Sequence, residues 1–293
     1  MRLGTRGSAL ALAQATIVAE ALGDAEIVTI KTSGDRGQAG GDKARFVREI
    51  ERALLDGEVD LGVHSAKDLP TGLPDELQVA GVPEREDPAD AYVGEAASLA
   101  DIPEGARVGT ASLRRRAQLL AARPDLDVAE LRGNVDTRLA KLRDGGYDGI
   151  VLAAAGLRRL GREDEIAFRF LPGEMTPAAG QGALALEARR GEGEALEAAA
   201  SLSDEKALLE VIAERAAVAD LDATCHTPVG VNAELDGDLL RLEAFVGLPD
   251  GSEWIRDRIE APAADPTMPG RDLATRLLAA GARELLGRAE AMT

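Results

Sequence analysis

The chain has 293 residues, of which 45% are hydrophobic, so it is long enough for two or three domains that each bury a core. A net charge of -18 excludes duplex nucleic acid as a partner, because binding to phosphates requires a basic surface. No apolar run approaches the roughly 18 residues that a membrane span requires, so no membrane partner is expected.

The start of the chain and its rare residue types bear on the compartment. "MRLGTRGSAL" becomes polar within a few residues, unlike a secretory signal, so we expect a cytoplasmic protein. Cys225 is the only cysteine, and the lack of an internal disulfide agrees with a reducing compartment. A surface crowded with carboxylates and poor in lysine is typical of a halophilic protein, because high salt screens the self-repulsion.

The first two thirds of the chain alternate short apolar runs, typical of buried strands, with helical patterns. Strands are predicted at residues 25–31, 59–65, 77–82, 106–110, 126–131 and 148–154. Helices are predicted at 9–22, 44–57, 112–123 and 134–145. This alternation indicates an α/β fold.

Two Pro-rich breaks, at residues 82–92 and 171–183, predict that the chain leaves a first lobe, builds a second, and returns with a strand at 183–189. The predicted domains are 1–86 with 178–202, then 87–177, then 203–293. In the third we expect a helix, an antiparallel three-stranded meander and a single closing helix, at 204–221, 229–262 and 271–287.

The charge is spread unevenly. Residues 87–177 hold 13 basic against 15 acidic side chains, whereas residues 178–293 hold 11 against 22. A site for an anionic ligand is the simplest reason for the middle of the chain to keep its arginines.

Ionisable side chains follow several predicted strands. In "GVHSAKDLP", Lys67 and Asp68 come at the carboxyl end of a strand, where ligands dock in α/β sheets, and a surface ion pair is an equal alternative. We expect His64 to be a structural histidine.

The next strand ends carry arginine. Ser112 is a predicted helix N-cap, and the arginines of the first turn that follows it oppose the helix dipole, so an anion is needed to offset Arg114, Arg115 and Arg116. "LRGNVDTRL" repeats the arrangement with an Asn134 cap, and "AGLRRLG" follows a third strand, which adds Arg132, Arg138 and Arg159. Together they predict a pocket for several carboxylates, with a solvated face as the alternative.

Two further stretches are weaker signals. "GTRGSALALAQA" is a loop-to-helix junction that presents Arg6, Ser8 and Gln14. Cys225, in "LDATCHTPVG", is either a small buried hydrophobe or a nucleophilic loop thiol. A metal site is disfavoured, because only His64 and His226 could join the thiol as soft ligands.

These stretches, with "EREDPADAYV" and "PAAGQGALALEAR", occur in the order and spacing of the porphobilinogen deaminase family, which the chain resembles from about residue 3 to its end. The resemblance implies three domains: two α/β lobes similar to type II periplasmic binding proteins, and a C-terminal α+β domain. It also implies that Cys225 carries a dipyrromethane cofactor through a thioether. On this primer four porphobilinogen molecules would be deaminated and joined head to tail, and water would then release the linear tetrapyrrole hydroxymethylbilane.

By the same resemblance, Asp68 is the catalytic carboxylate. The residues that would hold the cofactor are Ser65, Lys67, Thr110, Ser112, Arg114, Arg115, Arg132 and Arg138. The residues that would hold the incoming substrate or the growing chain are Arg6, Ser8, Gln14 and Arg159. Phe46 matches an aromatic residue that lies near the cofactor.

The chain departs from the family pattern at four points, one of which is residues 42–46, where "DKARF" replaces Gly-Lys-Gly/Ser-Leu-Phe. Ala9 replaces a proline, Thr224 replaces a glycine, and the segment between Gly34 and Phe46, which acts as a lid in the family, is several residues shorter. We expect a monomer. The rival prediction is a two-lobed module that binds a small anion without catalysis.

Overall fold

The computed structural model describes residues 1–30, 43–191, 193–224 and 226–292, and of residues 43–46 it describes the backbone alone. Cys225 therefore lies outside the described residues, as does the predicted lid as far as residue 42. Phe46 is placed only as a member of a helix.

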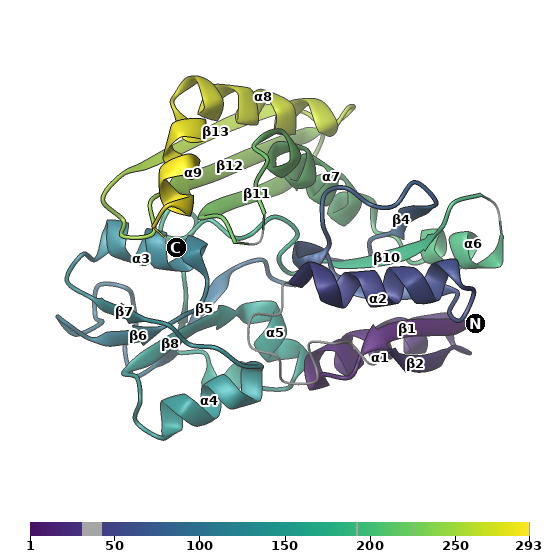
Figure 1. Cartoon of the computed structure of the whole chain (residues 1–293), viewed down its shortest axis with the longest axis horizontal. Coiled ribbons are helices and arrows are strands. Elements are labelled where there is room, and N and C mark those ends of the chain that lie inside the picture. The colour runs from purple at the N-terminus through teal and green to yellow at the C-terminus, as the bar shows by residue number, and fades with distance from the viewer. Residues whose placement is uncertain (31–42, 192, 225, 293) are drawn as a thin grey trace.

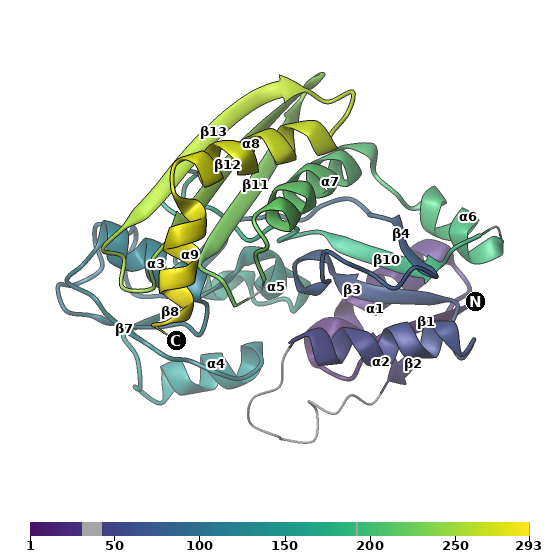
Figure 2. The same cartoon turned by 45° about the horizontal axis from the view of Figure 1, so that its top comes forward.

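The first lobe is a five-stranded sheet in the order β2-β1-β3-β10-β4 (Figure 1). Its strands are β1 (Arg2–Arg6), β2 (Glu26–Ile30), β3 (Leu61–Ser65), β4 (Leu77–Gly81) and β10 (Leu184–Arg189). Strand β10 runs antiparallel between β3 and β4, so the chain returns to the first sheet after it has built the second. Figure 2 shows two helices on opposite faces of this sheet, α1 (Ala9–Leu22) and α2 (Lys43–Leu55).

The second lobe is a five-stranded sheet in the order β7-β6-β8-β5-β9. Its strands are β5 (Asp90–Gly94), β6 (Arg107–Gly109), β7 (Asp127–Ala129), β8 (Gly149–Ala153) and β9 (Phe168–Arg169). Its helices are α3 (Leu113–Ala122), α4 (Val135–Arg143) and α5 (Ala154–Arg159). Two helices begin at the predicted caps, because Ser112 accepts the backbone N–H of Arg115 and Asn134 accepts that of Thr137.

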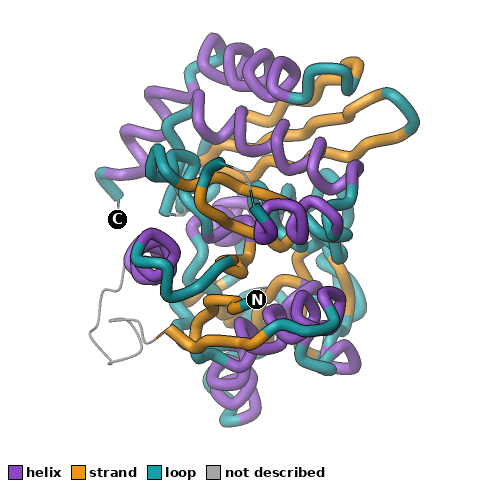
Figure 3. The backbone as a smooth tube through the Cα atoms, turned by 90° about the vertical axis from the view of Figure 1, so that its right-hand side faces the viewer, coloured by secondary structure: helices purple, strands orange, loops and turns teal. Residues whose placement is uncertain are grey.

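The third domain is a three-stranded antiparallel sheet, β11 (Val229–Asp236), β12 (Leu239–Gly247) and β13 (Trp254–Pro262). Helices α7 (Glu205–Asp220) and α8 (Thr267–Ala279) lie along one face of it, as Figure 3 shows, and α9 (Ala282–Glu290) follows. Within the part of the chain that the structure describes, every helix is too short or too polar to span a membrane.

These elements confirm the predicted α/β class and the antiparallel meander. The single closing helix predicted at 271–287 is wrong, because Gly281 adopts a left-handed φ of 102° and separates α8 from α9. Three strands were not predicted: β1, β5 and β9. Strand β5 was not predicted because it begins with Asp90, and a carboxylate is not typical of a buried strand. In the fold, Asp90 is fully buried.

Three remaining elements complete the lobes: α6 (Glu194–Ser201), which packs with α1, and the short turns η2 (Ala66–Asp68), which follows β3, and η3 (Glu163–Glu165). Two segments cross between the lobes, the first crossing at residues 82–89 and the second crossing at residues 170–183. They lie against each other, since the backbone N–H of Glu86 donates to the carbonyl of Gly182 at 3.3 Å. The third domain is fastened to both crossings by α7. Glu214 pairs with Arg85 at 2.8 Å and accepts the backbone N–H of Gly180 at 2.6 Å.

Candidate active site

The turn η2 places Lys67 and Asp68 at the carboxyl end of β3, where both side chains are half-buried. The Lys67 ammonium donates to the amide oxygen of Gln181 at 3.2 Å. Just before the turn, the Ser65 hydroxyl accepts a hydrogen bond of 2.8 Å from Gln14 of α1. The turn is therefore braced from α1 on one side and from the second crossing on the other.

His64 is confirmed as a structural histidine. Its Nε2 lies 2.9 Å from Oε2 of Glu187, and both side chains are buried between β3 and β10. This pair belongs to the sheet beneath the turn.

The first turn of α3 carries a buried cluster of charges around Asp90. The Asp90 carboxylate lies 2.6 Å from Arg114 Nη1 and 2.8 Å from Arg115 Nε, and all three side chains are almost completely buried. Burial alone would raise the pKa of Asp90, but the charges of Arg114 and Arg115 outweigh it and hold the pKa far below its usual value. The anion that offsets these arginines at the helix start is thus supplied by β5.

The first turn of α4 presents arginines in a different way. Arg132 is 71% exposed and pairs with Glu130 at 2.6 Å. Arg138 is half-buried, and its Nε donates to the carbonyl of Gly133 at 2.8 Å. Burial and the like charge of Arg115 lower the pKa of Arg138 to about 10, whereas the charge of Asp68 opposes that shift. The negative charge of Asp68 in the first lobe therefore acts on the Arg138 guanidinium of the second lobe.

Other predicted residues lie at the ends of strands and helices. Arg159, at the end of α5, donates to the carbonyl of Gly182 at 2.6 Å, and burial lowers its pKa. Thr110 follows β6 and accepts the backbone N–H of Ser112 at 3.2 Å. Arg6 ends β1, and Ser8 caps α1 by accepting the backbone N–H of Ala11.

The loop that carries the cysteine leaves α7 through Asp222, which has a left-handed φ of 52°. In Figures 1 and 2 this loop descends from the third domain toward the two lobes. The described residues on either side of Cys225 form a closed turn, because the Thr224 backbone N–H donates to the Thr227 hydroxyl at 3.0 Å and that hydroxyl donates to the Thr224 carbonyl at 2.7 Å. These two bonds hold Thr224 and Thr227 to each other.

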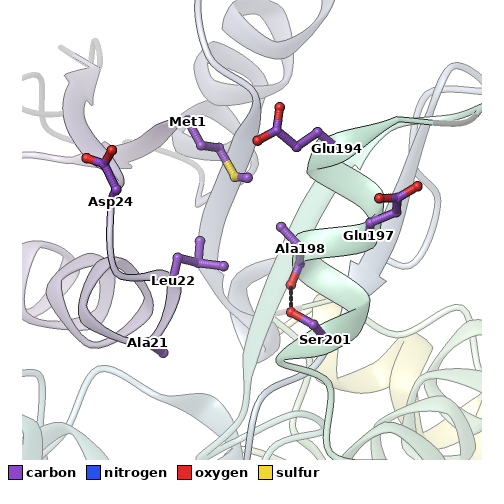
Figure 4. Close-up of a pocket in the computed structure, with 8 residues that line it drawn as sticks. All are labelled: Met1, Ala21, Leu22, Asp24, Glu194, Glu197, Ala198 and Ser201. Atoms are coloured by element: carbon purple, nitrogen blue, oxygen red, sulfur yellow. Dashed lines mark hydrogen bonds between the residues drawn. The ribbon is translucent and has the colours of Figure 1, made fainter.

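A pocket of about 560 Å³ lies elsewhere, at the start of β1 (Figure 4). Figure 4 shows three carboxylates around it, Asp24, Glu194 and Glu197. It sits at the opposite end of β1 from Arg6, and its acids would repel a polycarboxylate. This pocket is not the predicted anion site. Within the described residues, no three His, Cys, Asp or Glu side chains are grouped so as to hold a metal ion.

The described residues fit a dipyrromethane, which carries several carboxylates. Arg138 and Arg159 keep their charges in partly desolvated positions, and a bound carboxylate would relieve that cost. Two cations of the second lobe are thus available to bound carboxylates, and one of them, Arg138, interacts with the charge of Asp68 in the first lobe. Sequence reasoning missed Asp90, Glu130 and Gln181, the residues that hold the predicted cations in place. Strand β5 is buried at four consecutive positions, Asp90–Val93, and follows a charged, Pro-rich stretch, so no alternating pattern in the sequence marked Asp90.

Comparison with known proteins gives the same family over both parts of the chain. The family model "Porphobilinogen deaminase, dipyromethane cofactor binding domain" matches residues 1–197, and the model of the C-terminal domain of porphobilinogen deaminase matches residues 208–279. Porphobilinogen deaminase of Thermus thermophilus is 51% identical, and that of Roseiflexus castenholzii is 48% identical, each over 98% of both chains. That of Campylobacter hominis is 44% identical over 100% of this chain and 99% of its own.

Among solved structures, a periplasmic binding protein of Salmonella typhimurium with high arginine specificity matches with a TM-score of 0.38 and 13% identity. The match covers 71% of this chain and 93% of that one. A likeness at this level carries no argument about the present chain.

Proposed function

The chain belongs to the porphobilinogen deaminase family, transferases of tetrapyrrole biosynthesis, and we propose how its own residues divide the reaction. The overall conversion is 4 porphobilinogen + H₂O → hydroxymethylbilane + 4 NH₃. In this proposal residues 1–86 with 178–202 and residues 87–177 form the two lobes around the substrate, and residues 203–293 carry Cys225. When bound through a thioether to Cys225, the dipyrromethane supplies the terminal pyrrole carbon to which the first substrate is joined.

Asp68 is the catalytic residue in this proposal. Loss of ammonia from porphobilinogen leaves a delocalised cation, and a fixed carboxylate that faces it lowers the energy of that charge. Asp68 suits the role because η2 holds it at a strand end, half-buried, within the field of Arg138. The interaction of this half-buried carboxylate with a half-buried cation of the opposite lobe is what supports the proposal.

The other polar residues bind carboxylates in two groups. On the cofactor side are Ser65, Lys67, Thr110, Ser112, Arg114, Arg115, Arg132 and Arg138. On the substrate side are Arg6, Ser8, Gln14 and Arg159, which come from the ends of β1 and α5 and from α1. Since Arg114 and Arg115 are already engaged by Asp90, they contribute mainly a preorganised positive potential, and the more exposed Arg132 and Arg138 make the direct contacts.

The non-catalytic anion-binding module is not favoured, because the family match continues into the C-terminal domain that such a module lacks. We further propose a cytoplasmic monomer. Its adaptation to high salt, which is part of the same proposal, is supported by the net charge of -18.

The intact mass of the purified protein tests the proposed function. We expect it to exceed the 30.6 kDa of the bare chain by two deaminated porphobilinogen units. Cys225→Ala should abolish the added mass and the consumption of porphobilinogen together. A freshly purified, active protein with the mass of the bare chain would show that the cofactor assignment is wrong.

A further inference from the structure

Gln181 lies where the two crossings meet the turn η2. It stands between Gly180 and Gly182, which both adopt left-handed φ angles, 72° and 88°. A Cβ on Gly180 would lie 2.9 Å from the backbone of Ala66 in η2, and one on Gly182 would lie 2.1 Å from the carbonyl oxygen of Glu86 in the other crossing. Only glycines allow the backbone around Gln181 to pack so closely on both sides.

The side chain of Gln181 is fully buried, and its amide has one orientation that satisfies its neighbours. The amide nitrogen donates to the carbonyl of Pro88 at 2.7 Å and to the carboxylate of Asp90 at 2.9 Å. Both of these partners are acceptors, so the amide oxygen must point the other way. There it accepts the hydrogen bond of 3.2 Å from Lys67.

We propose that Gln181 is a positioning residue that fixes the Lys67 ammonium next to Asp68 and ties its place to the Asp90 cluster of the second lobe. One buried amide joins η2 of the first lobe to the carboxylate that holds Arg114 and Arg115. The relative position of the cations from the two lobes is thereby set before any ligand binds. The consequence for turnover rests on the proposed function, whereas the link between Gln181 and Lys67 does not.

Gln118 of α3 provides a matched control. It is also a buried glutamine bonded to the second crossing, since it donates to the carbonyl of Thr176 at 3.0 Å and accepts the Thr176 backbone N–H at 2.7 Å. Among the described contacts it touches neither Lys67 nor Asp90. Gln118→Met should therefore cost stability in the same way as Gln181→Met without affecting Lys67.

The first measurement is the rate at which each lysine is acetylated by a trace of acetic anhydride, followed by peptide mass. The chain has only five lysines, so Lys67 is resolved. We expect Lys67 to be labelled roughly threefold faster in Gln181→Met than in the parent, because an ammonium that loses an acceptor holds its proton less firmly. In Gln118→Met its rate should be unchanged.

Gln181→Glu separates positioning from packing. It keeps an oxygen toward Lys67 but loses the amide donors to Asp90 and Pro88. We expect slow labelling of Lys67 to persist while the unfolding midpoint in urea falls. If Gln181→Met does not fold, the labelling rate of Lys67 is measured in Gln181→Glu instead.

The second measurement is porphobilinogen turnover. Gln181→Met should lower kcat roughly tenfold with KM nearly unchanged, while Gln118→Met should stay within about twofold of the parent. Equal labelling of Lys67 in Gln181→Met and the parent, or equal turnover in the two Met variants, would overturn the inference. A parent protein that carries no adduct and consumes no porphobilinogen would instead refute the proposed function and leave the labelling result standing.

Discussion

Two aspartates, one in each lobe, lie near arginines and have opposite surroundings. Asp90 starts β5, is completely buried, and has its carboxylate engaged by Arg114, Arg115 and Gln181. Asp68 ends η2, is half-buried, and interacts electrostatically with Arg138 of the other lobe. A carboxylate saturated by buried donors holds the fold together. One that remains accessible is suited to stabilise a charge that appears during a reaction.

Asp90→Asn is expected to have the largest effect on the molecule. It leaves two guanidiniums buried without their counter-charge, and breaking a buried pair in this way costs roughly 3–5 kcal/mol of unfolding free energy. Urea unfolding at pH 7 measures the loss. If the variant is as stable as the parent, the cluster does not support the second lobe.

The pH dependence of the same variant provides an independent check. The pKa of Asp90 in the fold lies below its unfolded value of about 3.9, so its stabilisation is complete above that pH and is lost as the pH falls toward the folded pKa. The difference in stability between parent and Asp90→Asn should therefore narrow below pH 4. A gap that stays constant down to pH 3 would contradict the assignment of the charge.

Asp68→Asn should give the converse result. The amide keeps the size of the side chain and an acceptor oxygen, so the unfolding free energy should change little. The negative charge is lost, which should slow porphobilinogen consumption roughly 10²–10³-fold while some covalent cofactor is retained. Turnover and intact mass measured on one sample separate the two effects. Turnover within threefold of the parent would move the catalytic role elsewhere, with Glu86 or Asp87 as the next candidates.

The comparison also shows how far sequence reasoning reaches. Strand ends followed by arginine predicted an anionic ligand at the start of α3, whereas the anion that the structure places there is the chain's own Asp90. Its identity could not be predicted, because Asp90 is 24 residues away from Arg114 in a strand that a charged, Pro-rich stretch conceals. Helix α1 was predicted with the bounds that the structure gives, and the predicted ends of α2, α3 and α4 differ from the observed ones by one or two residues. The break at Gly281 was not predicted, because a glycine inside a helical pattern does not by itself reveal its φ angle.

Arg138→Gln tests the surroundings of Asp68, and we expect a smaller effect than for Asp90→Asn or Asp68→Asn. Burial lowers the pKa of Arg138 to about 10, so at pH 7 the fold bears a cost for keeping this side chain charged. Removal of the charge should leave the unfolding free energy unchanged or slightly higher, while cofactor loading and turnover fall roughly tenfold. If Arg138→Gln loses as much unfolding free energy as Asp90→Asn, Arg138 is a structural residue.

Glu130→Gln should have the smallest effect, because its partner is an arginine in water. Glu130 and Arg132 are 61% and 71% exposed, and such a pair contributes about 0–1 kcal/mol. Glu130 also competes with any bound carboxylate for the Arg132 guanidinium, so its neutralisation should preserve or speed cofactor assembly, whereas Arg132→Gln should slow it. Assembly is followed by intact mass after the apoprotein is mixed with porphobilinogen. Any faster assembly in Glu130→Gln should disappear in molar salt, because the salt screens the charge of Glu130 in the parent. A loss of more than about 2 kcal/mol of unfolding free energy in Glu130→Gln would place this pair with Asp90 among the supports of the fold.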